Sequence, residues 1–176
     1  MWDLLVYGPE PPPAADKPMA AVLAPIYHDE DGVLRIVFTK RPMTMPTHAG
    51  HLSFPGGRPH PGDAGPVGTA LREAHEEVGI EPASVEVLGF LPPVDTVQFS
   101  LLVVPVVGRL PVAPLLVPSA REVDRILTPP LEELADDSRW RSEDWRGRTV
   151  WFYDIDDEVL WGATAWMTRH LLGLPV

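Results

Sequence analysis

Three carboxylates gather in one short stretch of the sequence, REAHEEVG at residues 72–79. If this stretch is helical, Glu73, Glu76 and Glu77 fall within one turn of each other. Like charges at that spacing destabilise a helix by about 0.2–0.5 kcal/mol per pair. Solvent can tolerate this repulsion, and a bound cation removes it. Because carboxylate oxygens suit Mg²⁺ or Mn²⁺ together with phosphate oxygens, the stretch predicts either a solvated helix face or a metal site.

A long loop precedes this stretch and brings further polar groups next to it. Residues 41–66 are rich in Pro, Gly and His, and the expected helix follows them at once. A loop of that length in a compact domain is usually functional or disordered, and its position favours function. Gly56 and Gly57 let the backbone approach another group closely. Arg72, four residues before Glu76, has the reach to hold the loop against the helix.

The surrounding pattern predicts an α+β domain in which helices pack on a sheet. Pro66 suits the start of the helix and Gly79 its end, and the apolar stripe leaves the arginine and the carboxylates off the buried face. A second helix is expected over 159–174, with Trp161 and Trp166 packed in the core or, alternatively, lining a pocket. Further elements are expected as a short helix at 129–137 and as strands at 19–27, 33–40, 84–93, 98–110 and 148–155.

Length and composition limit the classes of protein. The 176 residues suit one domain, and 45% apolar residues suffice for a core. With 14 basic and 25 acidic residues the net charge is −11, which argues against partners such as nucleic acids or anionic membranes. A phosphorylated substrate would then need local help from a cation, an arginine or backbone donors. The absence of cysteine excludes disulfides, thiolate metal sites and cysteine nucleophiles.

The N-terminal residues differ in composition from the rest of the chain. We expect a Pro-rich N-terminal arm over 1–18 and a single domain over 19–176. The first residues lack the basic and apolar blocks of a secretory signal, and no apolar run reaches 18 residues. A cytoplasmic location is the expectation on these grounds.

The glycines, an acidic loop residue and the helix form one pattern of fixed spacing. Gly57 is followed after five residues by Asp63 and, after eight more, by REAHEEVGI at 72–80. This pattern resembles the box of the Nudix hydrolase superfamily: Gly, five residues, Glu, seven residues, then Arg-Glu-apolar-any-Glu-Glu-any-Gly-apolar. Asp63 stands in place of a Glu, and one additional residue precedes Arg72.

An upstream segment is similar to a narrower signature. The segment VFTKRPMTMPTHAGHLSFPGG at 37–57 resembles that of the coenzyme A pyrophosphatase branch: Leu-Leu-Thr, any, Arg-Ser, three residues, Arg, three residues, Gly, three residues, Phe-Pro-Gly-Gly. Pro42 replaces the Ser and Pro46 replaces the second Arg. The positions that match in register are Thr39, Arg41, Gly50, Phe54, Pro55, Gly56 and Gly57.

The resemblance implies a Nudix fold, an α/β/α sandwich around a mixed β-sheet. It implies hydrolysis of a nucleoside diphosphate linked to another group, with Mg²⁺ (or Mn²⁺) as cofactor. For the branch, coenzyme A or an acyl-coenzyme A would be cleaved to 3′,5′-ADP and (acyl-)4′-phosphopantetheine.

The resemblance also implies roles for the residues of the box. Glu73 and Glu77 would be the principal metal ligands, and Glu76 would bind a further ion or hold a metal-bound water. Arg72 would orient the loop. Asp63 would be a structural residue of that loop, or would complete the metal shell if it lies within reach.

The remaining candidates lie outside the helix. The resemblance implies that the general base would be either a glutamate of the box or a carboxylate from a later loop, for which Glu122 is the candidate. Glu122 is otherwise a structural carboxylate. Arg41 ends a strand beside the long loop, and two of the loop histidines flank Gly50. These side chains are either ordinary surface groups or contacts for substrate phosphate. The candidate substrate-binding residues are Arg41, His48, His51, Gly56 and Gly57.

Three functions stay open at this point. The first is a metal-dependent hydrolase of coenzyme A or acyl-coenzyme A. The second is the same chemistry on another small nucleotide, such as ADP-ribose or a dNTP, which Pro46 keeps open. The third is a non-catalytic nucleotide-binding Nudix domain, against which three mutually repelling carboxylates argue. A homodimer is compatible with each.

Overall fold

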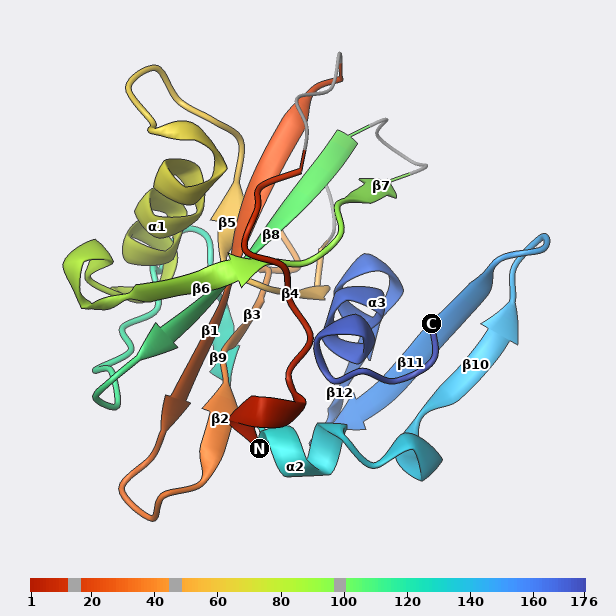
Figure 1. The fold of residues 1–176 in the computed structure, drawn as a ribbon. Helices are drawn as coiled ribbons and strands as arrows, with labels where there is room; N and C mark the ends of the chain where they lie inside the picture. Colours follow the sequence, from red (N-terminus) through yellow and green to blue (C-terminus); the bar gives the residue numbers. More distant parts are fainter. Residues whose placement is uncertain (13–16, 45–48, 97–100) are drawn as a thin grey trace.

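A mixed six-stranded sheet forms the centre of the fold (Figure 1). The structure, a computed structural model, describes residues 1–12, 17–44, 49–96 and 101–176. Strands β1 (Met19–His28) and β8 (Leu101–Leu110) lie parallel at the centre, and both are largely buried, as their apolar sequences predict. Their antiparallel neighbours are β2 (Leu34–Ile36) and β5 (Gly56–Gly57) beside β1, and β6 (Glu86–Phe90) and β7 (Val94–Thr96) beside β8.

Two smaller antiparallel sheets complete the β-structure. In one, β3 (Phe38–Lys40) pairs with β4 (Leu52–Ser53) and with β9 (Arg125–Leu127). The other consists of β10 (Arg141–Asp144), β11 (Thr149–Ile155) and β12 (Glu158–Trp161). The short helix α2 (Leu131–Leu134) and two 3₁₀ turns, Pro82–Ser84 and Asp137–Arg139, connect these elements.

The two longer helices lie on opposite sides of the central sheet (Figure 1). Helix α1 (Gly65–Val78) packs on the side toward which Leu23 of β1 points, whereas Ile26 of β1 joins the core on the side of α3 (Gly162–Leu171). Side chains on the two faces of one strand therefore contribute to two hydrophobic cores. This arrangement confirms the predicted α+β fold, an α/β/α sandwich around a mixed sheet.

The boundaries of several elements differ from the sequence expectation. The helix predicted to begin at Pro66 begins one residue earlier, at Gly65, and it stops as predicted at Gly79, whose φ is 75°. The prediction of one helix over 159–174 is wrong for its first residues. These residues pair with β11 as strand β12, and the helix begins only after Trp161, at Gly162 with its φ of 65°. The expected strand at 33–40 is divided between two sheets, and β10 was not predicted.

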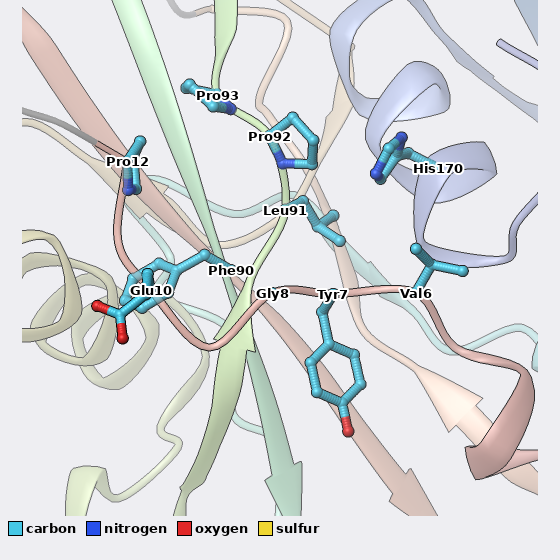
Figure 2. A pocket seen from close by; sticks show the side chains of 10 residues that line it. All are labelled: Val6, Tyr7, Gly8, Glu10, Pro12, Phe90, Leu91, Pro92, Pro93 and His170. Carbon is cyan, nitrogen blue, oxygen red and sulfur yellow. The ribbon is translucent and has the colours of Figure 1, made fainter.

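The N-terminal segment packs against the domain rather than projecting from it. Trp2–Leu4 forms a 3₁₀ turn, the Val6 N–H donates to the Leu171 carbonyl at 2.8 Å, and Gly8 pairs with Phe90. Figure 2 shows the shallow hollow beside it, which is lined by Val6, Tyr7, Gly8, Glu10, Pro12, Phe90, Leu91, Pro92, Pro93 and His170. None of the helices in the described part of the chain has the length and hydropathy needed to span a bilayer.

Candidate active site

Helix α1 turns two of its carboxylates toward the sheet instead of toward water. Glu73 and Glu77 are only 8% and 4% exposed, so the expectation that they lie off the buried face is wrong. They fit there because β5 presents glycines. The Gly56 N–H donates to Glu77 Oε2 at 3.3 Å, and a Cβ on Gly57 would lie 2.5 Å from Glu73 Cδ. Only a strand without side chains leaves this room.

A third carboxylate reaches the same place from a distant loop. Two backbone N–H groups of this loop donate to carbonyls of the last turn of α1: Val117 to Val78 at 3.0 Å and Ser119 to Glu77 at 2.8 Å. The Glu122 N–H then donates to the Ser119 carbonyl at 3.1 Å. As a result, carboxylate oxygens of Glu73, Glu77 and Glu122 all lie within 4.8 Å of one another.

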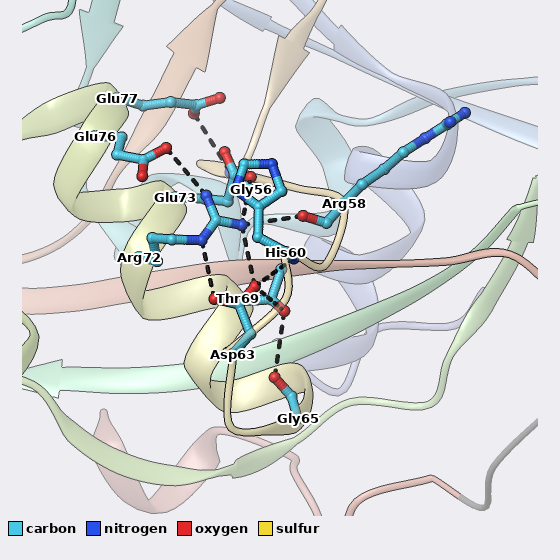
Figure 3. A network of polar contacts seen from close by, with 10 residues as sticks. All are labelled: Gly56, Arg58, His60, Asp63, Gly65, Thr69, Arg72, Glu73, Glu76 and Glu77. Carbon is cyan, nitrogen blue, oxygen red and sulfur yellow. Dashed lines mark hydrogen bonds and ion pairs between the residues drawn. The ribbon is translucent and has the colours of Figure 1, made fainter.

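Arg72 connects the helix to the glycine-rich loop (Figure 3). Its guanidinium donates to Asp63 Oδ1 at 3.0 Å and to the Arg58 carbonyl at 3.0 Å. It also lies 3.0 Å from Glu73 Oε1 and donates to Glu76 Oε2 at 3.0 Å. Arg72 therefore ties the loop to α1. It also holds Glu76, whose side chain is 48% exposed, outside the cluster of Glu73, Glu77 and Glu122.

The Asp63 carboxylate is directed into the loop. Besides Arg72, it accepts hydrogen bonds from Thr69 Oγ1 at 2.9 Å and from the His60 N–H at 2.8 Å. The hydrogen bond from Arg72, followed by those from His60 and Thr69, holds the pKa of Asp63 well below its usual range. These contacts place Asp63 in the structural part of the loop and not among the three clustered carboxylates.

Electrostatic repulsion in the cluster is only partly compensated. The pKa of Glu77 is raised to about 8, first by burial and then by the charge of Glu73, while the Gly56 N–H and Arg41 oppose the shift. Burial also raises the pKa of Glu73, and Arg72 opposes that shift. Close carboxylates that are costly to ionise are stabilised by a positive charge placed among them.

Besides Gly56 and Gly57, two of the candidate substrate contacts lie next to this cluster, Arg41 and His51. Arg41 is close enough to lower the pKa of both Glu77 and His51, and its buried Nε has no hydrogen-bond partner among the described residues. The Arg41 N–H donates to the His51 carbonyl at 3.1 Å. His48 and Pro46 lie outside the described residues.

Trp161 extends this surface, in agreement with the less favoured of the two positions that the sequence left open for it. Its ring lies 4.8 Å from that of His51, in an edge-to-face contact. It was expected in the core because 159–174 was interpreted as one helix. The signal that could have placed it on a strand is the alternation that it shares with its partner on β11, where Phe152 lies opposite Trp161.

The donor set fits a divalent cation. Three carboxylates offer hard oxygen ligands within a few ångströms, and two of them are buried without a matching positive charge for each. There is no thiolate or imidazole in the cluster, which favours Mg²⁺ or Mn²⁺ over zinc or copper.

Comparison with known proteins identifies the family. A family model of the NUDIX domain matches residues 17–146. The chain belongs to the Nudix family. Nudix hydrolases generally use divalent metal cations, in agreement with the donor set.

Relatives of this Nudix chain extend over most of its length. It is 41% identical over 158 residues to Nudix hydrolase 22, chloroplastic, of Arabidopsis thaliana, covering 83% of this chain but only 51% of the relative. It is 39% identical over 160 residues to the uncharacterized Nudix hydrolase NudL of Enterobacter sp. (strain 638), covering 89% of this chain and 82% of that one. The chain thus spans about half the length of the plant relative.

A solved structure shares the fold. A MutT/nudix family protein from Enterococcus faecalis superposes with a TM-score of 0.60 over 92% of this chain and 63% of that one, at 12% identity. The likeness at that identity concerns the fold alone, and it agrees with the sandwich described above.

Proposed function

We propose that this Nudix protein is a pyrophosphohydrolase that cleaves the diphosphate of coenzyme A or acyl-coenzyme A in the presence of Mg²⁺ or Mn²⁺. The observation that carries the proposal is the cluster of Glu73, Glu77 and Glu122, two of them buried, beside Arg41, whose Nε has no hydrogen-bond partner among the residues that the structure describes. A diphosphate and its cations supply the charges that this arrangement lacks.

Glu73, Glu77 and Glu122 would hold the cation. The cation would neutralise the diphosphate and lower the pKa of the attacking water. Glu76 has no place in this set as long as Arg72 holds its carboxylate, so we assign the third position to Glu122.

The remaining residues position the substrate and the water. The Arg41 guanidinium donates to a phosphate oxygen, and the Gly56–Gly57 backbone allows the diphosphate to come close. Water attacks one phosphorus atom, the bond from phosphorus to the bridging oxygen breaks, and Glu122, the exposed member of the cluster, accepts the proton of the water. Arg72 keeps the loop in register with the helix.

The choice of coenzyme A rests on the upstream signature, from Thr39 to Gly57, which resembles that branch. Pro46, in place of its second arginine, supports a second candidate: another nucleoside diphosphate derivative, such as ADP-ribose or a dNTP. The chemistry and the cation site are the same for both, and only the group beyond the diphosphate differs.

The test is incubation of the purified protein with Mg²⁺ and a panel of coenzyme A, acetyl-coenzyme A, ADP-ribose, NADH, diadenosine polyphosphates and dNTPs, with products identified by mass spectrometry. Release of 4′-phosphopantetheine at the highest rate supports the first candidate, and preferential cleavage of another member supports the second. Glu77→Gln is the inactive control. If the protein binds these compounds with Mg²⁺ and cleaves none of them, it is a binding domain and the proposed activity is wrong.

A further inference from the structure

An aromatic row lies on the outward face of the sheet formed by β10, β11 and β12. Phe152 and Trp161 are directly opposite each other on neighbouring strands, with their rings inclined by only 8° and their centroids 6.3 Å apart. Trp145, after the end of β10, contacts both rings at 6.0 and 5.8 Å. Its side chain is exposed, and the other two are partly exposed.

The hydrophobic core does not account for this row. The residues of the opposite face of the same sheet, Tyr153 and Leu160, are the ones buried in the core with α3. Arg141 lies over the Phe152 ring, 5.6 Å from its centre, and the exposed parts of the row are available to a ligand.

The row is continuous with the candidate active site. The His51 ring contacts Trp161 at 4.8 Å, and the His51 carbonyl accepts from the Arg41 N–H at 3.1 Å. Arg41 in turn lies close to Glu77. A molecule that extends from the carboxylate cluster past Arg41 would therefore meet the aromatic rings next.

The distribution of positive charge points the same way. The chain has an excess of acidic residues, yet five of its arginines form no ion pair within the described part of the structure: Arg41, Arg58, Arg121, Arg146 and Arg148. The first three adjoin the candidate active site in sequence or space, and Figure 3 shows the Arg58 side chain directed away from the Arg72 network. The last two flank Gly147 in the turn that begins with Trp145.

We propose that Trp145, Phe152 and Trp161 bind the planar base of the substrate's nucleotide, and that Arg146 and Arg148 contact an additional phosphate on its ribose. The proposal rests on the proposed function in that the diphosphate is placed at the carboxylate cluster. Aromatic side chains bind bases by stacking, and arginine binds phosphate through paired N–H donors. The class of substrate is then a nucleoside diphosphate derivative that carries a third phosphate on the ribose.

The first experiment measures binding without turnover. Quenching of tryptophan fluorescence is titrated with AMP, adenosine 3′,5′-bisphosphate and ribose 5-phosphate, for the parent protein and for Trp161→Leu, Trp161→Phe and the matched control Trp166→Leu on α3. Isothermal titration calorimetry gives the same affinities without relying on the removed fluorophore. We expect Trp161→Leu to weaken AMP binding about tenfold, and Trp161→Phe to retain most of it. Binding of ribose 5-phosphate should not change.

The second experiment concerns the additional phosphate. Replacing both turn arginines, Arg146→Gln with Arg148→Gln, should weaken adenosine 3′,5′-bisphosphate about tenfold and leave AMP unchanged. Arg139→Gln, which removes an exposed arginine already paired with Glu133, is the matched control and should change neither.

Equal AMP affinities of Trp161→Leu and Trp166→Leu would overturn the proposal that the aromatic row binds the base. A Trp161→Leu protein that loses self-association but keeps its affinity for AMP would overturn it as well. Equal loss of AMP and bisphosphate in the arginine variant would overturn the assignment of the third phosphate. Because these experiments measure binding and not hydrolysis, their outcomes are independent of the proposed activity. If no compound of the substrate panel is hydrolysed but AMP binding depends on Trp161, the proposed base site still holds while the proposed activity does not.

Discussion

Helices α1 and α3 lie on opposite sides of the sheet, and both bury charge, but in different ways. Arg169 of α3 is fully buried, and its Nε and Nη2 donate to the Pro175 carbonyl at 2.9 and 2.6 Å. Its guanidinium lies 2.8 Å from Asp137 and 3.5 Å over the ring centre of Trp151. The buried charge of α3 thus has partners in the chain itself.

The buried carboxylates of α1 have fewer such partners, because Glu73 shares Arg72 with Asp63 and Glu76. Glu77 accepts one backbone hydrogen bond at 3.3 Å, and its nearest charged neighbours include two other carboxylates. A group whose charge is satisfied within the fold contributes to stability, whereas a group whose charge is left unsatisfied stores free energy that a ligand can release. The difference indicates a structural role for Arg169 of α3, and it supports the proposal that a cation and substrate bind at α1.

The largest effect on stability should come from Arg169. Arg169→Met removes two charged hydrogen bonds to the Pro175 carbonyl and the ion pair with Asp137, so we expect the free energy of unfolding to fall by about 3 kcal/mol. Urea denaturation followed by circular dichroism measures it. Arg139→Met, at an exposed ion pair with Glu133, is the control, with an expected change below about 1 kcal/mol. Equal effects of the two substitutions would remove the contrast between the helices.

Glu77→Gln should lower activity but, unlike Arg169→Met, raise stability when no metal is present. Hydrolysis of the preferred substrate at saturating Mg²⁺ should fall by at least about a hundredfold, because a neutral amide is a poor cation ligand. At pH 9 without metal, the variant should nevertheless be more stable than the parent by about 1 kcal/mol, because a buried negative charge is gone. Initial rates and urea midpoints measure the two effects. A variant that is inactive and also less stable without metal would mean that Glu77 is a structural residue.

Local spacing accounts for the parts of the site that could be predicted from the sequence. Helix α1, its end at Gly79 and the proximity of Arg72 to Glu76 follow from residues three to seven apart along one helix. The contact between Arg72 and the loop also depends on local chain length, since Asp63 lies just before the helix.

Long-range pairing accounts for the parts that could not be predicted. The burial of Glu73 depends on Gly57 in β5, which is held by pairing with β1. The position of Glu122 depends on backbone hydrogen bonds between its loop and the end of α1. Trp161 was assigned to a helix because apolar periodicity cannot separate a short strand from the helix that directly follows it. In each case the deciding partner is distant in the sequence.

The poorly compensated charge of Glu77 should also make the stability of the metal-free protein depend on pH. The folded-state pKa of Glu77, about 8, lies above its value in the unfolded chain, about 4.3. The folded state therefore binds more protons between these values, and stability should fall as the pH rises from about 5 to 8, at no more than about 1.4 kcal/mol per pH unit. Urea denaturation across that range tests it. Glu77→Gln should flatten the profile, and saturating Mg²⁺ should raise stability most at pH 8. A parent protein whose stability rises steadily over this range would contradict the burial of an unpaired carboxylate.

The smallest expected effect is the difference in activity between variants of Glu122 and Glu76. The sequence left a glutamate of the box and Glu122 open as candidates for the general base. Glu122 shares the cluster with Glu73 and Glu77, whereas the exposed Glu76 is hydrogen-bonded to Arg72. Glu122→Gln should therefore raise the Mg²⁺ concentration needed for half-maximal activity about tenfold and lower the maximal rate, since it removes both a ligand and the proposed proton acceptor. Glu76→Gln should change the Mg²⁺ requirement less than about threefold, because its amide still accepts from Arg72. Activity titrated with Mg²⁺ for the two variants decides between them. If Glu76→Gln has the larger effect, Arg72 releases Glu76 when the cation binds, and the third ligand comes from α1 itself.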